Sequence, residues 1–169
     1  MVTGLRTRAW DIAATVVDPE IPVLTIEDLG VLRSVDEDGD RVTVELTPTY
    51  SGCPAIDAMR DDVKSALLGA GYAQVDVRMV LAPAWTTDWM SDDGKRKLRE
   101  YGIAAPNGRA AVHGNGAHGS GRTELRMAVK CPRCDSLDTR ELARFGSTSC
   151  KALYECRSCL EPFDFFKVL

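Results

Sequence analysis

Cys131-Pro-Arg-Cys134 and Cys156-Arg-Ser-Cys159 are two C-x-x-C pairs, separated by 21 residues, near the end of a 169-residue chain. A C-x-x-C turn places two sulfurs on the same side of a tight loop, so two such turns can supply four thiolates in a tetrahedron. The spacing therefore predicts a four-cysteine zinc ribbon over residues 124–169. Because thiolate fills every metal position, we expect a structural site with no catalytic role. Rubredoxin-like iron uses the same ligands, and two disulfides are the alternative without metal.

The ends and the apolar runs of the chain predict a cytoplasmic protein. Residues 1–10 lack the apolar core of a signal peptide, and no stretch approaches the roughly 18 apolar residues that a membrane-spanning helix requires. An unexported chain with six cysteines is expected to keep them as thiols, which again favours metal over disulfide. We expect no membrane partner.

Charge is distributed unevenly along the chain. Residues 1–104 hold 11 Lys and Arg against 18 Asp and Glu, whereas residues 124–169 hold 8 against 7. An acidic body joined to an almost neutral ribbon offers no basic surface for a phosphate backbone. The pattern therefore argues against nucleic-acid binding, although many zinc ribbons have that function.

The first 104 residues have the pattern of a small mixed-sheet α/β domain. Alternating apolar and polar residues predict strands over 31–35, 41–46 and 74–80, the first two joined by an acidic hairpin turn at 36–40. Helical spacing predicts two helices with these apolar faces: Leu5, Ala9, Ile12 and Val16, then Ile56, Met59, Val63 and Leu67. The order helix–strand–strand–helix–strand, followed by the zinc ribbon, predicts an α+β fold.

A short helix and a linker are predicted between this domain and the ribbon. Ser91 is a suitable N-cap and Gly102 a suitable end for a helix over 91–101. Residues 105–123 contain five glycines and no apolar period, which predicts a flexible linker. His113 and His118 lie in it, where we expect solvated side chains more than metal ligands.

Cys53 is a candidate functional thiol outside the ribbon. If Pro54 opens the second helix, Cys53 is its N-cap, where free amides and the helix dipole favour an anion and lower a thiol pKa. Thr47 and Thr49 supply hydroxyls nearby. The alternatives are a reactive or metal-binding thiolate and a small buried cysteine at a strand–helix junction.

The Asp18-Pro-Glu20 turn carries two carboxylates that could face the start of the second helix. Carboxylate and thiolate together can hold iron transiently. Asp-Pro-Glu is also an ordinary turn that ends a helix, and that interpretation stands without other evidence.

Cys150 is the second cysteine outside the ribbon's four. It could be a core residue, a spare metal ligand or a redox partner, and we favour a core position. Trp85 and Trp89 are likewise expected in the core or at an interface.

Several uncommon motifs occur in order along the chain. They are Asp18-Pro-Glu-Ile-Pro22, Ile26-Glu-Asp-Leu-Gly30, Thr47-Pro-Thr-Tyr-Ser-Gly-Cys-Pro54, Trp85-Thr-Thr-Asp-Trp-Met90, Cys131-Pro-Arg-Cys134 and Ser149-Cys-Lys-Ala-Leu-Tyr154. The first three resemble the metal–sulfur cluster assembly-factor family that includes the SufT-like proteins. With the last three, the chain is similar from end to end, apart from the linker, to the PaaD-like (PaaJ-like) proteins of phenylacetate degradation.

This resemblance implies an accessory protein of the phenylacetyl-CoA epoxidase system. That system has a di-iron oxygenase subunit and a reductase with flavin and a [2Fe–2S] cluster, and these subunits are the implied partners. The implied role is to mature or insert the iron–sulfur or di-iron centre of one of them, with transient iron or a cluster at Cys53 and Asp18 nearby.

The sequence itself contains no catalytic equipment: it lacks a nucleotide loop, a flavin fingerprint and paired Glu-x-x-His helices. A structural subunit that bridges the oxygenase components through the aromatic residues of the ribbon is the alternative. A thiol enzyme is the least favoured, because both histidines lie in the linker. Homo-oligomerisation stays open.

Overall fold

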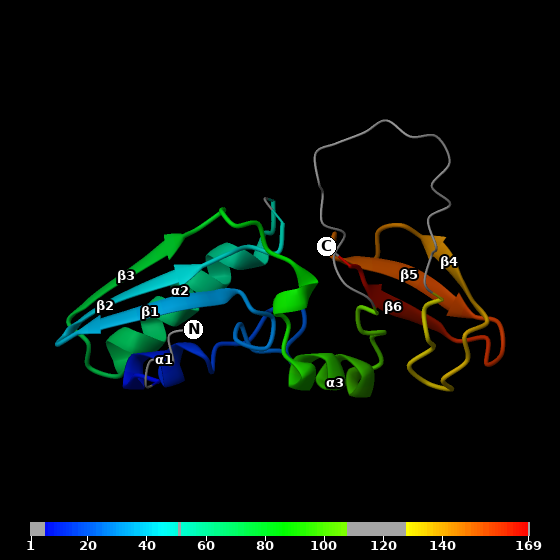
Figure 1. Ribbon diagram of the computed structural model, residues 1–169, viewed down its shortest axis with the longest axis horizontal. Helices are drawn as coiled ribbons and strands as arrows, with labels where there is room; N and C mark the ends of the chain where they lie inside the picture. The colour runs from blue at the N-terminus through cyan, green and yellow to red at the C-terminus, as the bar shows by residue number, and fades with distance from the viewer. Residues whose placement is uncertain (1–5, 51, 108–127, 169) are drawn as a thin grey trace.

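The computed structural model of the chain describes residues 6–50, 52–107 and 128–168. It shows two small sheets side by side, with one helix beneath the junction between them (Figure 1). The described residues contain no helix of the length and apolar character needed to cross a membrane.

The N-terminal domain is a three-stranded mixed sheet with helices on one face. Its sheet runs in the order β1-β2-β3, with β1 and β2 antiparallel and β2 and β3 parallel. The elements are α1 (Arg8–Ala13), β1 (Leu32–Asp38), β2 (Arg41–Leu46), α2 (Ala55–Gly69) and β3 (Gln74–Met79). This is the predicted helix–strand–strand–helix–strand order.

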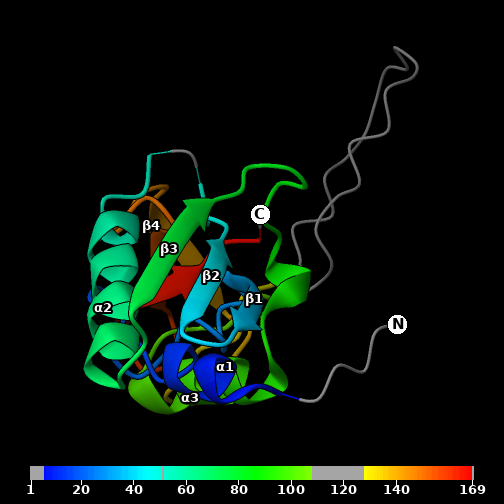
Figure 2. The ribbon, with the colours of Figure 1, turned by 90° about the vertical axis from the view of Figure 1, so that its left-hand side faces the viewer.

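The core of this domain follows from two sequence periods. Alternate residues of β2 are fully buried, namely Val42, Val44 and Leu46. The face of α2 that packs toward them carries Met59, Val63 and Leu67, at intervals of four residues. A helix stripe therefore packs into the same core as one face of a pleated strand, and Figure 2 shows α2 alongside β3.

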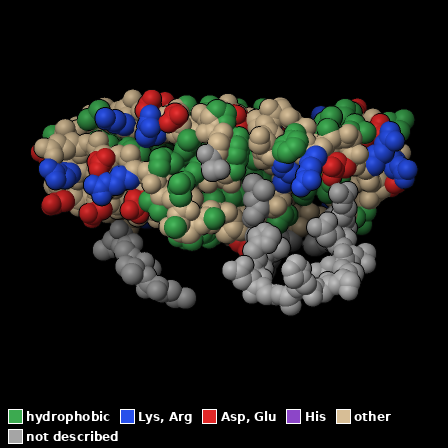
Figure 3. All heavy atoms as spheres, turned by 90° about the horizontal axis from the view of Figure 1, so that it is seen from above, with side chains coloured by type: hydrophobic (Ala, Val, Ile, Leu, Met, Phe, Trp, Pro, Cys, Tyr) green, Lys and Arg blue, Asp and Glu red, His purple; other side chains and the backbone are tan. Residues whose placement is uncertain are grey.

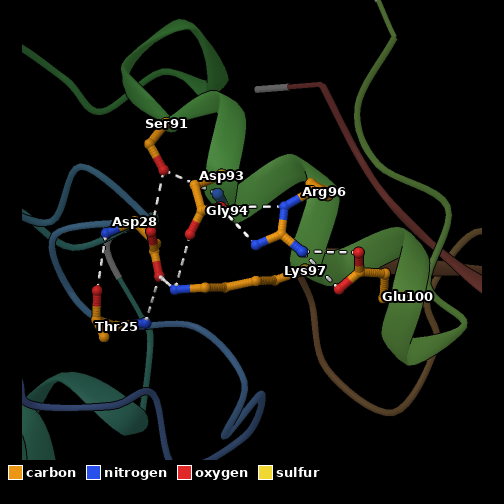
Figure 4. A network of polar contacts seen from close by, with 8 residues as sticks. All are labelled: Thr25, Asp28, Ser91, Asp93, Gly94, Arg96, Lys97 and Glu100. Atoms are coloured by element: carbon orange, nitrogen blue, oxygen red, sulfur yellow. Dashed lines mark hydrogen bonds and ion pairs between the residues drawn. The ribbon is translucent and has the colours of Figure 1, made fainter.

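Helix α3 (Asp92–Tyr101) follows the 3₁₀ turn η1 (Thr87–Trp89) and is fixed to the N-terminal domain by a polar network (Figure 4). Its predicted cap is present, because the Ser91 hydroxyl accepts a hydrogen bond from the Gly94 amide at 2.8 Å. The Asp28 carboxylate accepts from Ser91 Oγ at 3.0 Å and from Lys97 Nζ at 2.7 Å. Gly102 ends the helix with φ +93°, as predicted.

The C-terminal sheet is the ribbon. It consists of β4 (Thr139–Ala143), β5 (Lys151–Cys156) and β6 (Pro162–Phe166), antiparallel in that order. The cysteine pairs lie before β4 and around the turn between β5 and β6, so the predicted knuckles flank the strands. The ribbon has a small core of its own that includes Phe163 and Phe165.

The ribbon packs directly on the N-terminal domain. Ala104 forms a parallel bridge to Phe165, with its amide donating to Asp164 O at 2.8 Å and its carbonyl accepting from Phe166 N at 2.9 Å. Phe166 is 1% exposed and lies 6.2 Å from Trp85 between ring centroids. Phe166 and Cys150 therefore belong to the N-terminal core, although the sequence places them in the ribbon.

Two local predictions need correction. The first helix ends at Ala13, short of Val16, because the chain turns there toward a bridge between Val17 and Thr25. The acidic run does not form the whole hairpin turn: β1 continues to Asp38. Two hydrogen bonds hold Glu37 in the strand: its carboxylate accepts from the Tyr72 hydroxyl at 2.6 Å and from the Ala9 amide at 3.0 Å.

Most of the aromatic residues expected to offer a docking face on the ribbon are buried. Phe163, Phe165 and Phe166 are less than 10% exposed, because they pack within the ribbon or against the N-terminal domain, whereas Tyr154 is partly exposed. The exposed large apolar residues of the ribbon are instead Leu137, Leu142, Phe145 and Leu160.

The predicted linker lies mostly outside the described residues. Residues 108–127, which include His113 and His118, are not among them. The boundaries at 104 and 124 therefore stay predictions.

Candidate functional site

The four ribbon cysteines form one compact set of sulfurs. The sulfur atoms of Cys131, Cys134, Cys156 and Cys159 all lie within 4.8 Å of one another. Cys131 and Cys159 are 3.8 Å apart and Cys134 and Cys156 are 3.5 Å apart, measured between Sγ atoms. A tetrahedron with Zn–S bonds of about 2.3 Å has sulfur–sulfur edges of about 3.8 Å. The four side chains therefore fit a tetrahedral metal ion.

Backbone amides in the two knuckles point at these sulfurs. Arg133 N donates to Cys131 Sγ at 3.4 Å, and Cys159 N donates to Cys156 Sγ at 3.5 Å. Hydrogen bonds from the amides of Cys159 and Ser158 lower the pKa of Cys156 to about 6, although burial opposes them. Such donors favour thiolates, the form in which cysteine binds metal.

Cys53 lies just before α2, half-buried at the junction of the two domains. The helix begins at Ala55 and Pro54 holds the N-cap position, so the predicted cap is displaced by one residue. The Ala55 amide and the Thr49 hydroxyl both act to lower the pKa of the Cys53 thiol. The start of the helix therefore favours the thiolate, as expected for an anion site.

The predicted lowering of the Cys53 pKa is wrong. Burial raises this pKa, and the negative charges of Glu20 and Asp18 raise it further, so the two hydrogen bonds that lower it are outweighed. The N-cap argument considered only the local backbone, whereas burial and the carboxylates come from the tertiary fold. Burial and the two carboxylates therefore favour the thiol over the thiolate.

The Asp18-Pro-Glu20 turn carries two charges that raise the pKa of Cys53, and its facing Cys53 stays a prediction. Asp18 is 7% exposed, and its Oδ1 accepts from the amides of Glu20 at 2.7 Å and Ile21 at 3.3 Å. Burial raises the pKa of Asp18 despite these bonds, and burial together with Asp18 raises the pKa of Glu20. The turn does not end a helix, because α1 has already ended at Ala13.

The two predicted threonines differ in position. Thr49 is partly exposed, and its hydroxyl acts to lower the pKa of the Cys53 thiol. Thr47 is 2% exposed, and its amide donates to Val31 O at 2.9 Å, which fixes the end of β2. Thr49 therefore lies in the site, whereas Thr47 supports the loop from within the fold.

Sequence reasoning missed the part of the site that the ribbon supplies. Burial raises the pKa of Tyr50, in the Cys53 loop, and the Ser149 side chain acts to lower it. The next two residues, Cys150 and Lys151, are 6% and 5% exposed. The charge of Lys151 acts on Asp18. The Ser149-Cys-Lys motif was the available signal, but no spacing connects it to residue 53. We call Asp18, Glu20, Thr49, Tyr50 and Cys53, together with Ser149, Cys150 and Lys151, the Cys53 site.

The surface beside this site is apolar. Figure 3 shows hydrophobic side chains gathered in the middle of one face, with charged side chains concentrated toward the two ends. Met79 and Leu81, at the end of β3, are 37% and 66% exposed. The Val80 amide binds Leu46 O at 2.8 Å, which places this segment beside the strand that leads into the Cys53 loop.

Two family models match different parts of the chain. The model described as "Iron-sulfur cluster assembly protein" matches residues 8–81, which contain Asp18, Glu20 and Cys53. The model described as "PaaD zinc beta ribbon domain" matches residues 115–167, which contain Cys150 and the four clustered cysteines.

Relatives cover both the whole chain and its first domain. A protein of Escherichia coli (strain K12), named as a putative subunit of 1,2-phenylacetyl-CoA epoxidase, is 48% identical over 160 residues, which is 95% of this chain and 91% of that protein. "Fe-S protein maturation auxiliary factor SufT" of Staphylococcus aureus is 38% identical over 85 residues, 49% of this chain and 96% of that one.

A solved structure resembles the N-terminal domain. The domain of unknown function DUF59 from Bacillus anthracis superposes with a TM-score of 0.51 and 27% identity, covering 55% of this chain and 90% of that one. The chain therefore belongs to the family in which an iron–sulfur cluster assembly domain is followed by a PaaD zinc beta ribbon.

Proposed function

We propose that the protein is an accessory factor of the phenylacetyl-CoA epoxidase system in phenylacetate degradation. It would mature or insert the iron–sulfur or di-iron centre of a partner subunit, in the cytoplasm, where its free thiols stay reduced. The names of its relatives support both halves of this proposal, since one is an epoxidase subunit and another an iron–sulfur maturation factor. The observation that carries it is a half-buried Cys53 thiol just before α2, on whose ionisation the charges of Asp18 and Glu20 both act.

Cys53 is the residue we assign to hold the cargo metal. The Ala55 amide and the Thr49 hydroxyl favour its thiolate, and the negative charges of Asp18 and Glu20 would attract a divalent ion. An arriving ion replaces the proton that burial and these carboxylates keep on the thiol. Holding and releasing the metal is therefore coupled to a proton at the Cys53 sulfur.

The wide spacing of the candidate ligands in the Cys53 site supports transient metal binding. Among the described residues, the four ribbon cysteines are the set whose ligand atoms already lie close enough together to share one ion. The Cys53 site is spaced more widely, so it does not form a closed cage. A delivery factor needs such a site, because a closed one would retain its metal.

The four clustered cysteines are assigned to a structural zinc ion that organises the ribbon. Their sulfur spacing fits tetrahedral coordination, and the amides of the knuckles support thiolates. When bound, the ion would cross-link the two C-x-x-C turns and would take no part in a reaction. Native mass spectrometry should find about one zinc per chain, and iron in its place would overturn the choice of metal.

The partner is expected to cover the apolar surface beside the Cys53 site. Met79 and Leu81 lie next to the strand that enters the Cys53 loop, so a subunit seated there would approach the sulfur. The oxygenase subunits and the iron–sulfur reductase are the proposed partners. Such a surface matches the apolar patches typical of protein interfaces.

The test is to produce the epoxidase and its reductase together with wild-type protein or with Cys53→Ser. We expect the variant to leave the client short of iron and of activity, while Ala58→Ser, on an exposed position of α2, supports full loading. Iron-replete, fully active partners made with Cys53→Ser would overturn the maturation role.

A bridging component of the oxygenase complex is the alternative, and the word "subunit" in the name of the Escherichia coli relative favours it. The exposed Leu137, Phe145 and Leu160 of the ribbon would then form the contact surface. Co-purification in fixed stoichiometry supports the bridge, whereas transient, sub-stoichiometric association supports the assembly factor.

A further inference from the structure

Strand β3 is an open edge of the N-terminal sheet. The sheet order is β1-β2-β3, so among the described residues β3 pairs with β2 on one side only, and it forms the upper margin of this domain in Figure 1. All the residues of β3 are exposed or half-buried, whereas alternate residues of β2 are fully buried. An unpaired strand edge presents N–H and C=O groups that can pair with another strand.

The other edge strands have features that hinder such pairing. The pairings of β1 and of β4 each contain a register shift, and β6 is bridged by Ala104. The pairing of β3 with β2 runs without a shift from Gln74 to Met79, and the strand contains no proline. Bulges, prolines and covering segments are the usual protection of a sheet edge. In the part of the chain that the structure describes, β3 is therefore the flat edge that is open to a further strand.

The hydrogen bonds to β2 determine which residues of β3 point outward. Gln74 N donates to Asp40 O at 3.1 Å at one end of β3. Val80 N donates to Leu46 O at 2.8 Å just beyond the other end. Both donors are even-numbered, so the even-numbered residues direct their backbone groups toward β2, and the odd-numbered residues direct theirs to the open edge. The odd-numbered residues of β3 are Val75, Val77 and Met79.

The side chains of β3 are complementary to a second copy of the same strand. Val75 and Val77 pack against the core, so Asp76 and Arg78 lie on the other face of the sheet, where their side chains are 55% and 62% exposed. When two β3 strands pair antiparallel about Val77, Asp76 of each copy lies directly opposite Arg78 of the other. Val75 then lies opposite Met79. Two opposite-charge pairs therefore form on one face and an apolar row forms on the other.

Other two-fold registers lack this complementarity. An axis at Asp76 places two aspartates opposite each other, and an axis at Arg78 does the same with two arginines. Like charges directly opposite destabilise paired strands, whereas opposite charges stabilise them. An axis at Val75 or Met79 leaves only part of the strand paired. About Val77, the outward-pointing residues exchange hydrogen bonds, and the charged residues occupy the non-hydrogen-bonded pairs, where side chains lie closer together.

We propose that β3 is a homodimerisation edge, at which two copies of the chain pair antiparallel about Val77 and join their sheets into one. The Cys53 loop follows β2, whose last residue, Leu46, pairs with Met79. The two Cys53 sites therefore lie at opposite ends of the shared edge. Met79 takes part in the dimer contact, whereas Leu81 lies beyond the paired residues and is left for a client. This inference goes beyond the proposed function and does not depend on metal at Cys53.

The test is the mass of full-length protein in solution, produced with zinc and measured by sedimentation equilibrium under reducing conditions. We expect wild type to have twice the 18.4 kDa of one chain. Asp76→Arg and Arg78→Asp each place like charges opposite at both pairs, so each should raise the dissociation constant of the dimer about tenfold or more. A mixture of the two variants should recover wild-type dimerisation, because the heterodimer places arginine opposite aspartate at both pairs.

Asp36→Arg is the matched control. Asp36 is the register partner of Thr43, and Thr43 is the register partner of Asp76, so the same charge change is made in the same row of the sheet at its other edge. This variant should dimerise like wild type. Thermal unfolding of each variant shows that the fold is kept, as expected for substitutions at exposed positions.

Hydrogen exchange locates the contact on the chain. The amides of Val75, Val77 and Met79 should exchange slowly in wild type and rapidly in Asp76→Arg, because pairing with the second copy protects them. Rapid exchange of these amides in a wild-type dimer would mean that another surface joins the copies, which would overturn the inference.

A wild-type protein that stays monomeric at millimolar concentration would also overturn it, and so would single variants that dimerise as tightly as wild type. A monomer that adds a client's strand at β3 counts against the homodimer in the same way. The proposed function is judged separately, from the iron content of clients made with Cys53→Ser, because Cys53 lies outside β3.

Discussion

The rings of Trp85 and Phe166 meet with their centroids 6.2 Å apart, at an interplanar angle of 58°. Trp85 is anchored on its other side, because its Nε1 donates to Leu29 O at 2.9 Å. Phe166 is the last residue of β6 and is 1% exposed. One ring contact therefore connects the final strand of the ribbon with the core that carries the Cys53 site.

Phe166→Ala should destabilise the protein by about 3–5 kcal/mol, because it removes a fully buried aromatic ring and leaves a cavity. Chemical denaturation followed by tryptophan fluorescence measures this loss. Phe145→Ala is the control, since Phe145 is 62% exposed and its loss should cost less than about 0.5 kcal/mol. Equal effects of the two substitutions would mean that Phe166 does not join the two domains.

Gly30→Ala should be more destabilising than Gly39→Ala. Both glycines have positive φ, +69° and +57°, where a side chain costs about 1–2 kcal/mol. A Cβ on Gly30 would also lie 2.6 Å from Trp89 O and 2.7 Å from Trp89 Cβ, whereas a Cβ on Gly39 meets nothing within 4 Å. Thermal unfolding of the two variants compares them. A Gly39→Ala loss as large as that of Gly30→Ala would contradict the packing of η1 on this turn.

Asp28→Asn should weaken the attachment of α3, with an effect that depends on pH. Burial would raise the pKa of Asp28, but hydrogen bonds from Lys97, the Thr25 amide and Ser91 outweigh it and hold the pKa below the ordinary value of 3.8. A carboxyl with a lowered folded-state pKa stabilises the fold above its unfolded-state pKa, and this contribution disappears as pH falls through the folded-state pKa.

The Asp28→Asn variant should therefore lose about 1.5–3 kcal/mol near neutral pH, the range for hydrogen bonds to charged groups. The difference from wild type should shrink below about pH 4. Urea unfolding at a series of pH values measures it. Asp93→Asn is the control, because its side chain is 54% exposed and exposed ion pairs contribute about 0–1 kcal/mol. A difference that grows on acidification would contradict this assignment.

Local sequence patterns, namely apolar spacing and helix-capping residues, predicted most of the secondary structure. The four-residue spacing of Met59, Val63 and Leu67 indicated the buried face of α2, and Ser91 and Gly102 marked the ends of α3. Each of these signals acts within a few residues of the chain. The C-x-x-C pairs likewise predicted a compact set of sulfurs, because each knuckle is a local turn.

The candidate site could be predicted only in part. Asp18 was proposed as a neighbour of Cys53, but the sign of the Cys53 pKa shift was wrong, because burial and carboxylate charge depend on distant segments. Phe166 and Cys150 pack in the N-terminal core together with Trp85, and no sequence period connects residues so far apart. Domain packing is therefore the part that local patterns could not supply.

The most direct measurement is the metal content of the protein itself, produced with ample iron and purified without oxygen, for wild type and Cys53→Ala. We predict one firmly bound zinc in both proteins, and in wild type an additional labile iron that Cys53→Ala lacks. Equal iron in the two proteins, or none in wild type, would contradict the assignment of Cys53 as the thiol that carries iron to a client.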